Sequence, residues 1–199
     1  MNKTTAREIK VSCLGWLRFA RQMPYVATEF QNGMHVADVF AANSELSVEI
    51  EVKVSTSDYR QEFEKFKHRN VTHMLDRWPN KFYFTVPVTM SAFVLQDLES
   101  RHPEFGLISY NPGEVGGAEF KPWLRLSVVK RAGWLHREPP KPEELRRILM
   151  RMGSEIYGYH EAERAYGSVM STVRTAIDVA MIAHDQHPKP NIETIEEMP

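Results

Sequence analysis

The chain has 199 residues, 42% hydrophobic and 26% charged, which suits one core with a small appendage and excludes a solenoid or a large multidomain protein. Its net charge of −1 excludes an overall positive charge that would attract nucleic acid. Its single cysteine, Cys13, excludes a disulfide framework and a multi-cysteine zinc site, and it fits a reducing compartment. The N-terminus lacks the apolar stretch of a signal peptide, and the apolar segment 176–183 is too short to span a bilayer. We therefore expect a cytoplasmic protein that has no membrane partner.

The first half of the chain predicts a helix followed by three strands. Apolar residues recur at helical spacing over 5–22, ahead of Pro24. Three segments then have strand character, and they are separated by the turn signals Asn32-Gly33 and Asn43-Ser44. The segments are 25–30, 34–42 and 45–55. We expect them to form an antiparallel meander.

The third of these strands alternates strictly between apolar and polar residues. Val48, Ile50, Val52 and Val54 form one face, and Glu49, Glu51, Lys53 and Ser55 form the other. Ser55 or Ser57 can then cap a helix that carries Tyr59, Phe63 and Phe66 at helical spacing. We expect this helix to dock on the sheet.

The next segments predict a strand at 80–87, a helix over 91–100 and strands at 105–110 and 122–132 around a Gly-rich turn at 111–117. Strands that alternate with helices indicate an α/β layered core with some parallel pairing. We expect this core to occupy residues 1–136.

A Pro-rich segment at 137–144 marks a predicted boundary. Pro142 suits the first turn of a helix, and one apolar stripe runs from Leu145 to Ile156. A second stripe, from Ala165 to Ala180, follows Gly158. We expect a helical hairpin within the extension 137–186, packed on the core or on a second subunit, and a disordered tail at 187–199.

Charge is segregated along the chain. Residues 28–51 contain five acidic residues and no Lys or Arg, whereas residues 121–151 contain nine basic residues and three acidic ones. An acidic centre beside a basic segment suits a metal-dependent enzyme that acts on a polyanion. Ordinary solvated helix faces would give the same pattern.

Candidate chemistry centres on Asp38, Glu51 and Lys53. If the strand 34–42 pairs with 45–55 through the turn at 43–44, Asp38 lies near Glu51. Such carboxylates repel each other unless a divalent cation binds both, and Mg²⁺ suits a site of one or two carboxylates, waters and a substrate phosphate. Lys53 could then orient or deprotonate a water, or neutralise charge on the phosphorane. The alternative is a solvent-facing polar side of an amphipathic strand.

These residues resemble the signature of the PD-(D/E)xK nuclease superfamily. Asp38 is followed at the required distance by Glu51-Val52-Lys53, and the predicted helix, three strands, helix and strand match the order of the family core. The segments Ser55-Thr56-Ser57-Asp58-Tyr59 and Phe82-Tyr83-Phe84-Thr85-Val86 are similar to the MmcB-like DNA-repair branch. The resemblance covers about residues 5–110. The chain departs from the family at Ala37, where many members have proline, and in an insertion at 68–78.

The resemblance implies a restriction-endonuclease-like mixed sheet flanked by helices and a DNA hydrolase that acts in repair, recombination or processing. It implies Mg²⁺, for which Mn²⁺ can substitute, held by Asp38, Glu51 and the backbone carbonyl of Val52. Lys53 would be the catalytic lysine. Glu29, or else Glu8, would be an additional acidic residue near the metal.

DNA is the expected partner. Basic side chains interleaved with Trp123 and Trp134 are suited to a DNA backbone and to base stacking. They are Lys121, Arg125, Lys130, Arg131, Arg146 and Arg147. Two alternatives stay open: a buried tryptophan pair beside a solvated face, and a non-catalytic DNA-binding or assembly module. In the latter, the C-terminal helices would bind a partner. For either function, the apolar stripes of these helices suggest a homodimer.

Overall fold

The computed structural model describes residues 5–33, 35–65, 78–116 and 123–185, and within these ranges it has a mixed α/β architecture. Helix α1 (Ala6–Gly15) continues into a π-helical turn, η1 (Trp16–Ala20). The other helices are α2 (Thr56–Glu62), α4 (Val88–Arg101) and α5 (Pro142–Asp185). The strands are β1 (Tyr25–Asn32), β2 (His35–Ala42), β3 (Ser47–Val52), β4 (Lys81–Pro87), β5 (Gly106–Gly116) and β6 (Trp123–Lys130).

Six strands form one mixed sheet in the order β1-β2-β3-β4-β5-β6. The first three strands are an antiparallel meander, as the turn signals predicted. Strands β3, β4 and β5 are parallel, and β6 returns antiparallel to β5. The parallel pairing follows from the helices between these strands, since a parallel neighbour requires a crossover connection.

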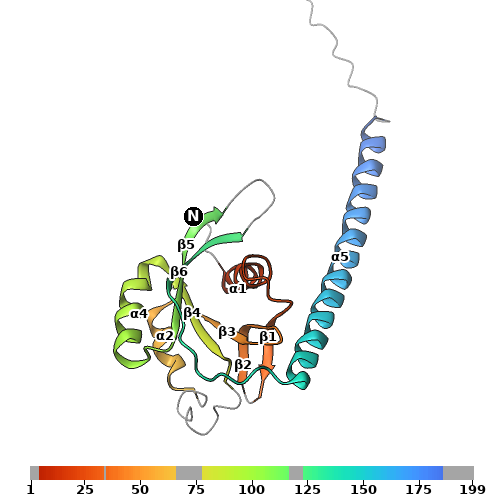
Figure 1. Cartoon of the computed structure of the whole chain (residues 1–199). Coiled ribbons are helices and arrows are strands. Elements are labelled where there is room, and N and C mark those ends of the chain that lie inside the picture. Colours follow the sequence, from red (N-terminus) through yellow and green to blue (C-terminus); the bar gives the residue numbers. More distant parts are fainter. Residues whose placement is uncertain (1–4, 34, 66–77, 117–122, 186–199) are drawn as a thin grey trace, which may run out of the picture. The chain divides into compact units, whose positions relative to one another are not determined.

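Helices cover both faces of the sheet (Figure 1). On one face, α1 and η1 contribute the buried Ile9, Cys13 and Leu17 to a cluster that includes Ile50 of β3. On the other face, α2 and α4 enclose an aromatic cluster that includes Phe84. The alternation of strand side chains places neighbouring residues of β4 in different clusters, because successive side chains point to opposite faces.

Both faces of β3 are buried. All six of its residues are buried, and Glu49 and Glu51 are each 1% exposed. Lys53, directly after the strand, is 3% exposed. The alternative of a solvent-facing polar side is therefore wrong, because residues of α2 pair with Lys53 and His35 of β2 pairs with Glu49.

The compact unit that contains the sheet extends to Ser154, beyond the boundary predicted at 137–144. Asn80 holds the Pro-rich segment to the sheet: its amide donates to the carbonyls of His136 and Glu138. The first turns of α5 then bury Ile148 in a cluster with Phe30 and other residues of β1 and β2.

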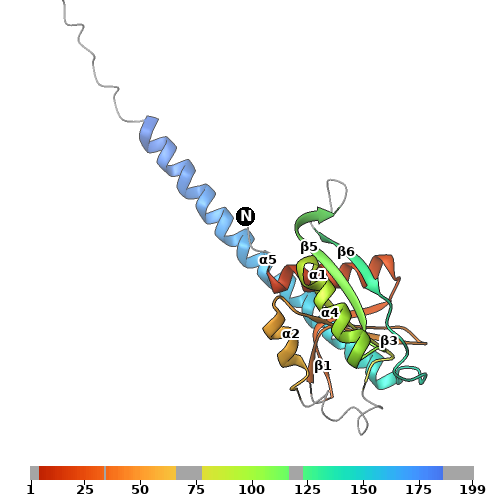
Figure 2. The ribbon, with the colours of Figure 1, turned by 90° about the vertical axis from the view of Figure 1, so that its left-hand side faces the viewer.

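One helix, α5, spans the range for which the sequence predicted a hairpin (Figure 2). The helix continues through Gly153, Gly158 and Gly167 without a break. A glycine inside a helix costs only about 1 kcal/mol relative to alanine, so it need not end the helix. Leu149 and Ile156, expected on the packed stripe, are both more than half exposed.

Several boundaries also differ from the predictions. Helix α4 begins at Val88, directly after β4, instead of at Ser91. Strand β5 continues to Gly116, through most of the predicted Gly-rich turn. Phe66, the insertion at 68–78 up to Arg77, and the predicted tail at 187–199 lie outside the described residues. Within the described part of the chain, no helix has the length and apolar character that crossing a bilayer requires.

Candidate active site

Asp38 lies where β2 and β3 separate. The two strands pair from Ala42 and Ser47 up to Val39 and Ile50, and Asp38 and Glu51 lie directly beyond this last pair. At that point the Asp38 carboxylate accepts a hydrogen bond from the backbone N–H of Val52, at 2.8 Å. The Asp38 side chain thus replaces the next backbone hydrogen bond between β2 and β3. It lies at the end of the strand pair where the two strands diverge.

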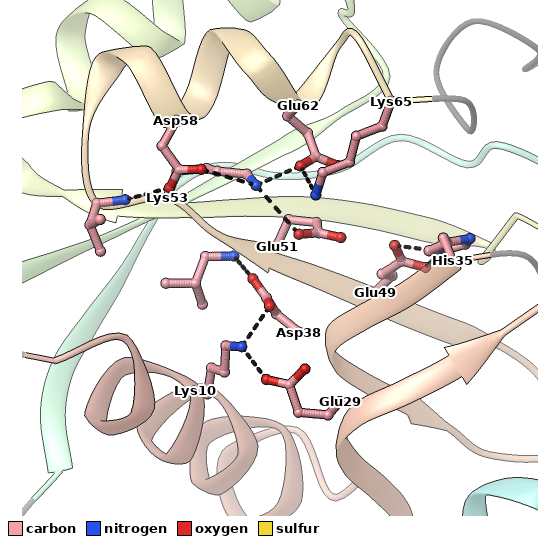
Figure 3. A network of polar contacts seen from close by, with 12 residues as sticks. Lys10, Glu29, His35, Asp38, Glu49, Glu51, Lys53, Asp58, Glu62 and Lys65 are labelled. Carbon is pink, nitrogen blue, oxygen red and sulfur yellow. Dashed lines mark hydrogen bonds and ion pairs between the residues drawn. The ribbon is translucent and has the colours of Figure 1, made fainter.

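Asp38, Glu51, Val52 and Lys53 line one hollow of about 260 Å³. The hollow is bounded by α1, which contributes Lys10, and by residues of α2 and of the turn before it. Figure 3 shows these polar side chains converging from the two strands and the two helices. The structure therefore brings together the three residues that the sequence singled out.

Lys53 is surrounded by carboxylates. Its ammonium nitrogen lies 2.5 Å from Glu62, 3.6 Å from Glu51 and 3.7 Å from Asp58. Burial alone would lower the pKa of Lys53, but the charges of Glu62 and Glu51 raise the pKa above its ordinary value. Lys53 is therefore an ammonium ion at neutral pH. Of the two roles considered for it, neutralisation of phosphorane charge fits this state better than deprotonation of water.

Glu62 was missed by the sequence analysis. It is completely buried, and its carboxylate is shared between Lys53 and Lys65, each at 2.5 Å. The available signal was helical spacing, because Asp58 and Glu62 are four residues apart and so share one face of α2. That face points at Lys53 in Figure 3.

The Ser55-x-x-Asp58 pattern has a structural explanation. The Ser55 hydroxyl accepts a hydrogen bond from the backbone N–H of Asp58, at 3.2 Å, and caps α2. In return, the Asp58 carboxylate accepts from the backbone N–H of Val54, at 3.3 Å. These reciprocal bonds fix the turn between β3 and α2, and so hold Lys53 between the sheet and the helix.

Lys10 was also missed, and it contacts two of the predicted metal ligands. Its ammonium lies 2.7 Å from the Asp38 carboxylate and also pairs with Glu29. Burial would lower the pKa of Lys10, but the hydrogen bonds and charges of Asp38 and Glu29 raise it overall. Glu29 has a φ of 48°, a left-handed conformation that is strained for a residue other than glycine. Glu8, in contrast, caps α1 by accepting from the backbone N–H of Thr5.

A second buried carboxylate lies on the same face of β3. Glu49 is paired with His35, whose Nε2 atom is 3.0 Å from both carboxylate oxygens. Neither residue is among those that line the hollow. His35 therefore partly compensates the burial of the Glu49 carboxylate.

The donor set fits a magnesium site of two carboxylates. Asp38 and Glu51 supply hard oxygen atoms to one hollow, and Mg²⁺ requires only one or two carboxylates when waters and a phosphate complete its shell. A preformed site of three or more His, Cys, Asp or Glu is absent from the described residues. Glu29 is not among the residues that line the hollow, so the fit depends on Asp38 and Glu51.

The residues predicted to bind DNA do not form one patch. Arg125 and Arg131 are exposed on or just after β6, whereas Arg146 is exposed on the first turns of α5, which pack against β1 and β2 at the other end of the sheet. Arg147 lies over the ring of Phe30, at 5.6 Å. Lys121 lies outside the described residues.

Lys130 has a structural role. Its ammonium donates to the carbonyls of Phe105, at 2.6 Å, and of Pro103, which fastens β6 to the segment before β5. Burial lowers the pKa of Lys130 below its ordinary value. These contacts direct its charge toward the protein instead of toward a ligand.

No protein-family model matches this chain, and a comparison with curated proteins gives no match. What the structure establishes is a mixed α/β protein with a buried cluster of carboxylates and lysines at one end of its sheet. Its function is therefore argued from this geometry.

Proposed function

We propose that the protein is a metal-dependent nuclease with a restriction-endonuclease-like fold that hydrolyses DNA phosphodiester bonds. The observation that carries this proposal is the burial of Glu51 and Lys53, at 1% and 3% exposure, in one hollow with Asp38. Burying charged groups is costly, and such clusters are typical of functional sites. The order helix, three strands, helix and strand agrees with the resemblance noted in the sequence.

In this proposal Asp38 and Glu51 hold Mg²⁺, with the Val52 carbonyl as the third protein ligand that the resemblance implies. When bound, the metal supplies an activated water nucleophile and Lewis-acid stabilisation of a phosphate oxygen. Val52 orients Asp38 through its N–H group. Lys53 presents a fixed positive charge to the hollow, and Glu62 holds that charge in place.

The test is cleavage of a panel of labelled single-stranded, duplex, nicked and branched DNAs with Mg²⁺ or Mn²⁺, beside an EDTA control. We expect metal-dependent cutting by the native protein that Asp38→Asn and Lys53→Ala both abolish. Lys141→Ala, which removes an exposed lysine remote from the hollow, is the matched control and should cut normally. Undiminished cutting by either site variant would refute the assignment.

One observation favours the second candidate, a non-catalytic DNA-binding or assembly module. Lys10 already supplies a positive charge 2.7 Å from Asp38, so this carboxylate has a counterion within the protein. A module of this kind would retard DNA without cutting it, and Mg²⁺ would not raise its melting temperature. A metal-dependent rise in melting temperature that Asp38→Ala removes would instead support the nuclease.

A further inference from the structure

A second hollow, of about 350 Å³, lies at the opposite end of β3 from the candidate active site. Val48, near the start of the strand, lines this second hollow, whereas Lys53 lines the first. Strands rise about 3.3 Å per residue, so these two residues are roughly 17 Å apart along the strand direction. The second hollow is therefore separate from the cluster of carboxylates.

Three cations line the second hollow: Arg21, Lys81 and Arg131. No described residue that lines it is acidic. Like charges gathered around one concave surface repel one another and attract an anion. We call this hollow the cationic pocket.

The cationic pocket also has aromatic and apolar walls. Trp16 and Tyr83 line it together with Leu17 and Met23. The guanidinium group of Arg21 lies 4.6 Å from the centroid of the Trp16 ring, which makes a paired aromatic and cationic surface. A bare inorganic anion would leave the apolar walls unused, and a purely apolar ligand would desolvate the cations without compensation.

The backbone beside the cationic pocket is irregular. Trp16 and Leu17 belong to the π-helical turn η1, and single π-helical turns are frequent at functional sites. Gln22, just after the turn, has a φ of 54°, a strained conformation for a residue with a side chain. This irregular segment is what carries Trp16 and Arg21 to the pocket.

We propose that the cationic pocket binds a nucleotide unit, with the phosphate against the three cations and the base against Trp16 and Tyr83. Aromatic rings beside cations are the usual surface for unpaired nucleotides, because every base has a face for stacking and every phosphate a charge. The volume lies in the range of small-molecule sites. The unit is either a free mononucleotide or one residue of a single strand. The second case, one residue of a single strand, rests on the proposed nuclease function and adds a binding site for its DNA substrate.

The test is binding to the full chain in EDTA, so that neither metal nor cleavage is involved. Calorimetric titrations use dAMP, deoxyadenosine and inorganic phosphate, and fluorescence anisotropy uses a labelled eight-nucleotide single-stranded DNA. The test variant is Arg21→Ala with Arg131→Ala, since both side chains are exposed and their removal spares the core. Arg101→Ala with Arg164→Ala removes two exposed arginines that do not line the pocket, and it is the charge-matched control.

A free-nucleotide site predicts that dAMP binds at least about tenfold more tightly than deoxyadenosine or phosphate, and that the double variant loses this affinity about tenfold. If the pocket binds one residue of single-stranded DNA, the double variant should lose affinity for the oligonucleotide, even when dAMP does not bind to the native protein. Equal effects of the pocket variant and the control variant Arg101→Ala with Arg164→Ala would overturn the proposal, as would phosphate binding as tightly as dAMP. Because Lys53→Ala should keep the pocket intact, loss of cleavage and loss of pocket binding are separable results.

Discussion

Glu62 determines the charge environment of Lys53 more directly than any other described residue. The two side chains are both buried, and their charged atoms are 2.5 Å apart. A buried ion pair of this kind contributes little when compared with an apolar pair, but removing one partner leaves the other charge buried without compensation. The network therefore fixes the position of Lys53 more than it stabilises the fold.

We expect Glu62→Ala to lower the free energy of unfolding by about 3–5 kcal/mol. The triple variant Glu51→Gln, Lys53→Met and Glu62→Leu should recover most of that loss, because it also neutralises the buried Glu51 that Lys53 contacts. Urea denaturation measures both values. Glu143→Ala, which removes an exposed carboxylate, should change stability little. If the triple variant were as unstable as Glu62→Ala alone, the loss would reflect packing and not an unpaired charge.

Lys10 competes with a metal for Asp38. Removing its ammonium in Lys10→Met should therefore tighten Mg²⁺ or Mn²⁺ binding at least about tenfold, or 1.4 kcal/mol, as measured by calorimetry. Because the pKa of Lys10 is raised above 10.5, its ammonium persists below that pH, and the difference should hold across pH 6 to 9. Unchanged or weaker metal binding by Lys10→Met would show that Lys10 does not compete with a metal for Asp38.

The sequence predicted the strand residues of the site but not their helical partners. Alternation along 45–55 and the short turn at 43–44 were sufficient to predict that Asp38 lies near Glu51, and both residues line the same hollow. Glu62 and Lys10 approach from α2 and α1, and which residues of a helix face a given strand depends on how the helix packs. Local patterns do not contain that information.

At the scale of elements, local patterns predicted most strands and helices. Period-two alternation and turn residues indicated β1 to β4, and helical spacing indicated α1, α2 and α4. The π-helical turn η1 and the continuous α5 were not predicted. Glycine and proline mark possible breaks, but tertiary packing and helix propensity decide whether a break occurs.

Two glycine-to-alanine substitutions test the sheet and helix α5. We expect the first to destabilise the protein and the second to strengthen the helix. A methyl group at Gly106 would lie 2.3 Å from the Tyr83 ring and 2.8 Å from the backbone nitrogen of Ala132, so Gly106→Ala should destabilise the core by at least about 2 kcal/mol. A methyl group at Gly158 would have no atom within 4 Å other than those of the neighbouring helix backbone. Gly158→Ala should therefore increase the helical signal in circular dichroism. A decrease in that signal would indicate a turn at Gly158.

At the scale of the whole chain, the described hydrophobic clusters lie entirely within residues 1–154. A chain that ends at Ser154 should therefore unfold cooperatively, with a melting temperature within a few degrees of that of the full chain. Loss of cooperative unfolding would show that residues 155–199 are required for the core.

The exposed apolar side chains of α5 relate to the homodimer predicted from the sequence. Ile156, Tyr157, Tyr159 and Tyr166 are each more than half exposed. If these residues form the dimer contact, sedimentation velocity should show a dimer for the full chain and a monomer for residues 1–154. A monomeric full chain at micromolar concentration would refute the predicted homodimer.

Cys13 makes the protein convenient for site-specific labelling. It is the only cysteine of the sequence, its side chain is completely buried, and burial raises its pKa to about 12. At pH 7 almost none of this sulfur is thiolate, the form that maleimides attack. A cysteine introduced at an exposed position, such as Tyr159 on α5, should therefore react alone. The native thiol can be left in place when fluorophores or spin labels are attached.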